Sequence, residues 1–156
     1  MRKYRIMFVC HGNICRSPMA QFVFLDVAKR MGDAELFNVD SSATSYEEIG
    51  NPLYPPVRRL LDSEGIKYHI TYAKKLMRED YEKHDLFVCM DERNLRMLRA
   101  IFGEDRDQKV HRLLDFTESP RDVSDPYYTR DFDSVFRDIK SGCEALYTRL
   151  KTTKCK

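Results

Sequence analysis

The sequence predicts an α/β protein, in which a doubly wound, open parallel sheet of about four strands lies between two layers of helices. Short apolar runs of strand length alternate along the chain with longer segments whose apolar residues recur at helical spacing. Residues 85–91 form a continuous apolar run bounded by aspartates, typical of a strand buried on both faces of a parallel sheet. In such sheets ligands bind at the carboxyl ends of the strands.

Residues 4–10 are expected to form the first strand, because their apolar run is too short for a helix. A helix should follow from Ser17 to about Arg30, since Ser17 is a suitable N-cap and Pro18 suits the first helical position. Gly32 is a stop signal for this helix. Its apolar side chains are expected to be buried: Met19, Phe22, Val23, Leu25 and Val27.

Residues 36–43 indicate a second strand, and the polar loop 44–55 separates it from a helix over 56–63. The strand over 85–91 is followed by a helix over 92–102.

A short strand over 109–114 and a last helix over 131–150 complete the predicted elements. The last helix presents apolar residues at helical spacing: Phe132, Val135, Phe136, Ile139, Leu146 and Leu150. The length of 156 residues fits one domain, which we place over residues 1–151, followed by a polar tail over 152–156. This order of elements is that of a flavodoxin-like fold.

Composition narrows the classes of partner. The net charge is +2 and no basic run stands out, so charge does not indicate a nucleic-acid partner. No apolar segment approaches the ~18 residues of a membrane span, and the N-terminus lacks the pattern of a signal peptide. We therefore expect a cytoplasmic protein without a membrane partner. We also expect a monomer, with weak self-association as the alternative.

The five cysteines are odd in number and match neither a disulfide framework nor a zinc site. Cys89 and Cys143 lie in apolar segments and are expected to be buried, whereas Cys155 is expected to be exposed in the polar tail. His69, His84 and His111 have no neighbouring metal ligands in the sequence. We expect neither a metal nor a cofactor.

The segment Val9–Pro18 places Cys10, five residues, and then Arg16-Ser17 at the junction of a strand and a helix. A loop that closes onto a helix N-terminus points backbone N–H groups at one spot, where the helix dipole also favours an anion. Arg16 adds a planar, permanently charged fork that fits two phosphate oxygens. The same positive field favours the thiolate form of Cys10. These residues predict phosphate-ester chemistry on a cysteine nucleophile.

Hydrolysis of a phosphate monoester also needs a general acid, because the leaving oxygen must be protonated as it departs. Asp125, in the stretch Asp-Pro-Tyr-Tyr, lies between the last predicted strand and the last helix. That loop should return to the carboxyl edge of the sheet, beside Cys10.

With these motifs together, the sequence resembles the low-molecular-weight protein tyrosine phosphatases over nearly its whole length. The resemblance rests on Val9–Pro18 and on Asp125-Pro126-Tyr127-Tyr128, with further similarity at residues 39–43, 90–95 and 131–132. It implies that Cys10 attacks phosphorus, that Arg16 binds the phosphate, and that Asp125 is the general acid and then the general base. It implies a phosphotyrosine-containing protein as substrate, with small aryl phosphates also hydrolysed.

The resemblance implies supporting roles as well. Ser17 would hydrogen-bond the Cys10 thiolate, and Asn13 would hold the loop in a left-handed conformation with support from Ser41. The remaining loop residues that contribute to phosphate binding or loop support are His11, Gly12, Ile14 and Cys15. The substrate rim would contain Tyr46, Glu47, Tyr127 and Tyr128. Cys15 would form a reversible disulfide with Cys10 that protects the nucleophile from irreversible oxidation.

The sequence departs from the family pattern at two places. Thr71 stands where the family commonly has a histidine that braces the loop asparagine, which puts that bracing network in doubt. Glu47 occupies a rim position often filled by an aromatic residue, so the slot is expected to be more acidic. His11 is expected to be a rim residue that points away from the thiolate.

Alternative functions follow from the same motif. A related phosphatase branch hydrolyses phosphoarginine and typically has Thr at position 14, where this chain has Ile14. A thiol-dependent arsenate reductase would need a relay of further cysteines on a flexible loop, which the sequence does not suggest. A non-catalytic phosphotyrosine-binding module would have lost Cys10 or Asp125, and both are present.

Overall fold

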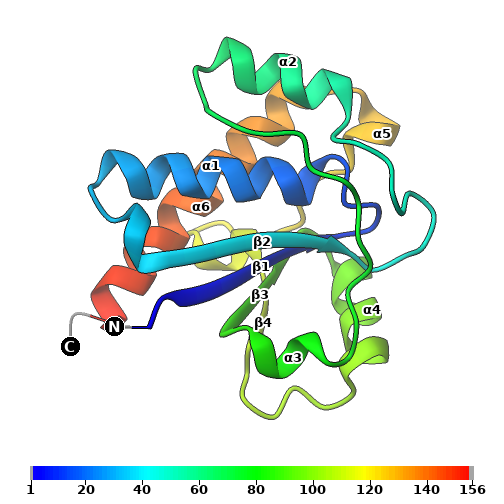
Figure 1. Ribbon diagram of the computed structural model, residues 1–156, viewed down its shortest axis with the longest axis vertical. Helices are drawn as coiled ribbons and strands as arrows, with labels where there is room; N and C mark the ends of the chain where they lie inside the picture. Colours follow the sequence, from blue (N-terminus) through cyan, green and yellow to red (C-terminus); the bar gives the residue numbers. More distant parts are fainter. Residues whose placement is uncertain (1, 155–156) are drawn as a thin grey trace.

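The computed structural model describes residues 2–154, and its sheet is parallel throughout (Figure 1). The strands are β1 (Tyr4–Cys10), β2 (Phe37–Ala43), β3 (Leu86–Cys89) and β4 (Val110–Arg112), in the spatial order β2-β1-β3-β4. The helices are α1 (Arg16–Arg30), α2 (Pro55–Ser63), α3 (Asp80–Lys83), α4 (Glu92–Phe102), α5 (Pro126–Thr129) and α6 (Phe132–Lys154), with short 3₁₀ helices η1 (Ala34–Leu36) and η2 (Leu113–Phe116). The predicted doubly wound, flavodoxin-like fold is confirmed.

Alternation along the central strand β1 divides the interior into two cores. Ile6, Phe8 and Cys10 face a cluster that includes residues of α1, α2 and α6. Met7 and Val9 face a smaller cluster with residues of α3 and α4. Figure 1 shows the corresponding layers, with α1 and α6 on one side of the sheet and α3 and α4 on the other. Because Cys10 ends β1, it lies between these layers at the carboxyl edge of the sheet.

The first helix differs from its predicted start. It begins at Arg16, with Cys15 at the N-cap and no side-chain capping bond, so Pro18 occupies the third helical position. Ser17 does not cap the helix because its hydroxyl oxygen accepts hydrogen bonds from Cys10 Sγ and Asn13 Nδ2. Gly32, with φ 76°, follows the end of the helix as expected.

Other element boundaries also differ from their predicted positions. β3 covers only Leu86–Cys89 of the predicted 85–91, because Asp85 accepts hydrogen bonds from Arg5 and Asp91 caps α4. β4 ends at Arg112, and the remainder of the predicted strand over 109–114 enters η2. The helix over 131–150 extends to Lys154, so helical structure continues into the expected polar tail.

Two of the cysteines lie in the core of the protein. Cys89 and Cys143 are fully buried, as expected, and burial raises the pKa of both thiols. Cys155 lies outside the described residues. Within residues 2–154, no helix is long and apolar enough to cross a membrane.

Candidate active site

The loop between β1 and α1 folds around the Cys10 sulfur. The backbone N–H groups of Asn13 and Ser17 point at Sγ from 3.3 and 3.4 Å, and the thiol donates to Ser17 Oγ at 3.0 Å. Asn13 has φ 61°, the left-handed conformation that Asn tolerates better than most residues and that the sequence predicted here. Only 3% of Cys10 is exposed. The loop therefore places a cysteine sulfur among N–H donors at the N-terminus of a long helix.

A buried set of hydrogen bonds braces this loop. Asn13 Nδ2 donates to Ser17 Oγ at 2.8 Å and to Ser41 Oγ at 3.0 Å. Ser41 Oγ in turn donates to Gln21 Oε1 at 2.7 Å. Asn13 Oδ1 accepts from the backbone N–H of Lys74 at 3.1 Å. All of the polar atoms of the Asn13 amide group thus have partners, from three separate segments of the chain.

Thr71 takes no part in this brace. Its buried hydroxyl has no hydrogen-bond partner within the described part of the chain. The bracing that the sequence put in doubt is supplied instead by the main chain of Lys74, three residues further on. Gln21 was not identified from the sequence as part of this brace. In the sequence, Gln21 is only a polar residue on the apolar face of the predicted first helix, and nothing there indicates its hydrogen-bond partner.

Arg16 is buried, and its guanidinium is held by several polar contacts. Its Nη1 donates to Asp91 Oδ2 and to the Val123 carbonyl oxygen, both at 2.8 Å. Its Nη2 lies 3.6 Å from Asp125 Oδ2. Burial by itself would lower the pKa of Arg16, but the charges of Cys10 and Asp91 outweigh it and raise the pKa. The guanidinium is therefore a fixed positive charge in the site.

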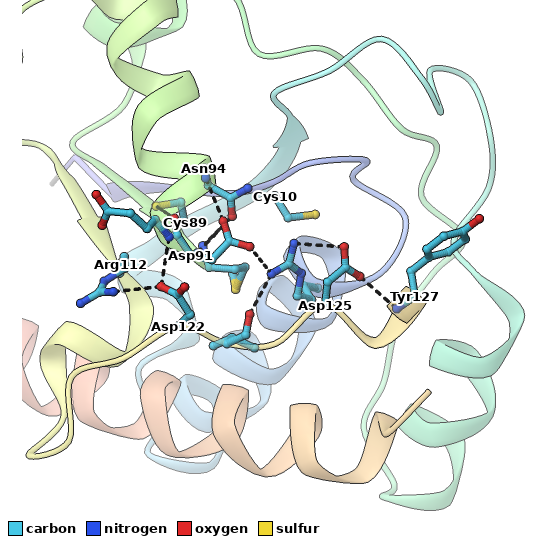
Figure 2. A network of polar contacts seen from close by, with 12 residues as sticks. Cys10, Cys89, Asp91, Asn94, Arg112, Asp122, Asp125 and Tyr127 are labelled. Atoms are coloured by element: carbon cyan, nitrogen blue, oxygen red, sulfur yellow. Dashed lines mark hydrogen bonds and ion pairs between the residues drawn. The ribbon is translucent and has the colours of Figure 1, made fainter. Parts of the chain in front are cut away.

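Asp91 is a site residue that sequence reasoning did not single out. One carboxylate oxygen accepts from the Asn94 N–H at 2.8 Å and so caps α4 (Figure 2), while the other accepts from Arg16 Nη1. The Asn94 side chain completes a capping box by accepting from the Asp91 N–H at 3.2 Å. The Asp-x-x-Asn spacing signals the cap. The contact with Arg16, which lies 75 positions away in sequence, has no local signal.

Asp125 lies at the N-cap of the short helix α5. Its Oδ1 accepts from the Tyr127 N–H at 3.0 Å, and its Oδ2 faces Arg16. The preceding loop is attached to the end of β3, because Val123 N–H donates to the Met90 carbonyl at 2.8 Å. The loop thus returns to the carboxyl edge of the sheet, as the sequence predicted.

These groups open into a cleft of about 540 Å³. Its lining includes residues that the sequence predicted for the site, namely residues 10–16, Glu47, Asp125, Tyr127 and Tyr128. It also includes residues that the sequence did not indicate: Glu48, Asn51, Pro52, Tyr54, Pro55 and Arg93. Tyr127 and Tyr128 are 68% and 73% exposed, so neither is packed away under the last helix. Tyr46, which the resemblance also places on the rim, is 69% exposed, and the Lys75 ammonium lies 4.9 Å from its ring centre.

The histidines fall into two groups. His11 Nε2 lies 2.9 Å from Glu47 Oε2 at the rim, so its ring is turned toward the loop that follows β2. His84 and His111 contact main-chain carbonyl oxygens, and His69 packs edge-on against Phe22. Within residues 2–154, no group of three or more His, Cys, Asp or Glu side chains is arranged to hold a metal ion.

A cysteine sulfur, a fixed guanidinium and a carboxyl group converge on a loop of N–H donors at the edge of a parallel sheet. This fold and site fit the class of α/β enzymes that act on phosphate esters.

Comparison with known proteins gives the family. The family model described as "Low molecular weight phosphotyrosine protein phosphatase" matches residues 5–156. The low molecular weight protein-tyrosine-phosphatase YfkJ of Bacillus subtilis is 37% identical over 96% of this chain and 97% of its own length. The human low molecular weight phosphotyrosine protein phosphatase is 36% identical over 90% and 91%.

Solved structures agree with the sequence relatives. The crystal structure of YfkJ superposes with a TM-score of 0.94 at 36% identity, covering 99% of this chain and 98% of that one. A protein tyrosine phosphatase from Entamoeba histolytica, with Hepes in its active site, gives a TM-score of 0.90 at 29% identity, covering 97% and 99%. The chain belongs to the low molecular weight phosphotyrosine protein phosphatase family.

Proposed function

We propose that this protein hydrolyses phosphotyrosine in proteins, and small aryl phosphates, through a phosphocysteine intermediate on Cys10. The observation that carries the proposal is the meeting of Cys10, Arg16 and Asp125 in one cleft, with Arg16 Nη2 3.6 Å from Asp125 Oδ2. Family membership supports the reaction class, and the roles of the individual residues are argued from their contacts.

In the first step, the Cys10 thiolate attacks phosphorus while the bond from phosphorus to the aryl oxygen breaks. Asp125 gives its proton to the departing oxygen, because it faces the cleft beside Arg16. Arg16 Nη1 is already used by Asp91 and Val123, so its Nε and Nη2 groups are the donors that face the phosphate oxygens. Together with the loop N–H groups they stabilise the charge of the transferred phosphoryl group.

In the second step, Asp125 takes a proton from water, the water oxygen bonds to phosphorus, and the bond between sulfur and phosphorus breaks. Ser17 assists the departing thiolate. Asn13 Nδ2 donates to Ser17 Oγ and fills an acceptor position of that oxygen, which leaves the Ser17 hydrogen free to point at sulfur. Inorganic phosphate and free Cys10 result.

The cleft also supports an aromatic ester as substrate. Ile14 belongs to the loop over residues 10–16, which we call the phosphate loop. Together with Tyr54, Tyr127 and Tyr128 it gives the cleft apolar and aromatic surface. We place the enzyme in the cytoplasm as a monomer with phosphotyrosine-containing protein substrates and no nucleic-acid partner. Phosphoarginine is the alternative substrate, and arsenate reduction is not favoured because Cys89 and Cys143 are too deeply buried to act as a relay.

The test is release of nitrophenolate from p-nitrophenyl phosphate in the presence of EDTA. Cys10→Ser should abolish turnover and Asp125→Ala should reduce it by about 10²–10⁴-fold. Cys143→Ala, which alters a buried cysteine outside the cleft, is the control for loss of a thiol. Turnover that survives Cys10→Ser would refute the mechanism.

A second measurement decides the substrate class. Initial rates should be higher on a phosphotyrosine peptide than on a phosphoarginine peptide, and the reverse order would reassign the substrate. The activity should follow a bell-shaped pH profile with an acidic optimum, since Asp125 must carry its proton while Cys10 has lost its own.

A further inference from the structure

One wall of the cleft carries negative charge that the proposed chemistry does not use. Glu47 and Glu48 line the cleft on the loop after β2, beside the loop that holds Cys10. A carboxylate near a site for a phosphate dianion repels that substrate, so Glu47 opposes the binding of a small aryl phosphate. The negative charge of Glu47 therefore does not serve the binding of the phosphate group, and we ask which other part of a substrate it could bind.

The segment that carries Glu47 is attached to the phosphate loop by its main chain. Thr44 N–H donates to the Cys10 carbonyl at 2.9 Å, and Ser45 N–H donates to the His11 carbonyl at 3.1 Å. Ser45 Oγ donates to the same His11 oxygen at 2.9 Å and accepts from the Glu47 N–H at 3.4 Å. The position of Glu47 is therefore fixed relative to the nucleophile.

The carboxylate itself is also oriented. His11 Nε2 lies 2.9 Å from Glu47 Oε2, and the Glu47 side chain remains 70% exposed. Its neighbour Glu48 differs, because Glu48 Oε2 accepts from Asn51 Nδ2 at 2.6 Å within its own loop. Glu47 is thus the carboxylate of this wall that is both held by the phosphate loop and open to a bound substrate.

We propose that Glu47, positioned by His11, determines substrate specificity by pairing with a cationic residue next to the phosphotyrosine of the protein substrate. The inference rests on the proposed phosphatase function and adds a sequence preference to it. A lysine or arginine beside the phosphotyrosine gains an ion pair at the rim, whereas an acidic neighbour meets like charge. An exposed pair of this kind is worth up to about 1 kcal/mol, which corresponds to about five-fold in kcat/KM.

The experiment compares phosphotyrosine peptides that differ only in Lys or Glu directly before or directly after the phosphotyrosine. In one of these two positions, the wild-type enzyme should prefer Lys over Glu by about five-fold in kcat/KM. Glu47→Gln should reduce this ratio to below about two-fold. The same variant should lower the KM for p-nitrophenyl phosphate, because a repulsive charge is removed.

The controls separate charge at this position from charge in general. Glu64→Gln removes an equal charge from an exposed residue that follows α2 and should leave the peptide ratio unchanged. Arg93→Gln removes the opposite charge from the cleft lining and should raise the ratio. His11→Ala should weaken the preference and His11→Gln should retain it, because glutamine keeps an N–H donor for Glu47.

The outcomes distinguish this inference from the proposed function. A wild-type enzyme with no preference for Lys in either position, or a preference that survives Glu47→Gln, overturns the inference while the phosphatase activity stands. Failure of the wild-type enzyme to hydrolyse any phosphotyrosine peptide or aryl phosphate overturns the proposed function itself.

Discussion

Substitution of Asp91 by asparagine tests how Arg16 is held. Asp91 uses one oxygen to cap α4 and the other to bind the buried Arg16 at 2.8 Å. Asparagine is as good an N-cap as aspartate, so Asp91→Asn keeps the cap through its amide oxygen, while its NH2 group replaces the oxygen that accepts from Arg16 and removes both that hydrogen bond and the charge. Asp91→Ala removes both contacts. The pair of variants therefore separates the two functions of one side chain.

The expected magnitudes follow from burial. Arg16 is 3% exposed, and the loss of a charged hydrogen-bond partner from such a group costs about 1.5–3 kcal/mol of unfolding free energy. The remaining contacts of Arg16, to the Val123 carbonyl and to Asp125, limit the loss to that range for Asp91→Asn. Asp91→Ala should lose about 1 kcal/mol more, the usual value of an N-cap. Because an unheld guanidinium no longer fits the phosphate, kcat/KM should fall by about 10–100-fold in both variants.

Urea denaturation and p-nitrophenyl phosphate kinetics measure the two quantities independently. Saturating inorganic phosphate should stabilise the wild type more than either variant, since phosphate binding depends on Arg16. An Asp91→Asn variant with wild-type kcat/KM would refute the view that Asp91 positions the guanidinium. Equal stability of the Asn and Ala variants would refute the capping contribution.

Three further predictions concern other parts of the chain. Burial opposes ionisation of Asp85, but hydrogen bonds from Arg5 and Arg2 outweigh it and hold the pKa well below its usual range. Asp85 therefore stabilises the fold above its unfolded pKa of about 4. Asp85→Asn should cost about 2 kcal/mol at neutral pH in urea denaturation, and this difference should shrink in acid; a constant difference would contradict the assignment. Gly142→Ala should lower the melting temperature despite the better helix propensity of alanine, because its Cβ would lie 2.4 Å from Leu113 Cγ; an unchanged or higher melting temperature would show that Leu113 can move aside. Peroxide should convert the Cys10 thiolate to a sulfenic acid that Cys15 captures as a disulfide with loss of water, so dithiol should restore the wild type but Cys15→Ser much less; equal recovery would exclude the disulfide.

The fold and the grouping of Cys10 with Arg16 around one loop could be predicted because their signals are local. Apolar runs and stop signals identify the strands and helices. Cys10 and Arg16 are separated by five residues, and this short spacing by itself predicts that a cysteine and an arginine meet around one loop. The position of Asp125 near Cys10 could also be predicted, because a loop that follows a strand of a parallel sheet starts at the carboxyl edge of that sheet.

The contacts that hold these groups in place could not be predicted, because they depend on residues far apart in sequence. The sequence does not indicate that Asp91 binds Arg16 or that Gln21 binds Ser41. It also does not indicate that the Lys74 N–H donates to Asn13. The prediction that Ser17 caps the first helix was wrong for a similar reason. Its hydroxyl oxygen accepts hydrogen bonds from Cys10 and Asn13 instead.

The brace at Lys74 shows why the loop does not depend on the side chain at position 71. The segment around Lys74 extends the sheet beside the end of β2, since Ala43 N–H donates to the Lys74 carbonyl and Leu76 N–H donates to the Ala43 carbonyl, both at 2.8 Å. In extended backbone the N–H and C=O of one residue point the same way, so the Lys74 N–H also faces the sheet. Asn13 Oδ1 receives this donor at 3.1 Å. Any residue except proline supplies the same N–H, and the phosphate loop is therefore held by the geometry of the sheet edge, whatever side chain stands at position 71 or 74.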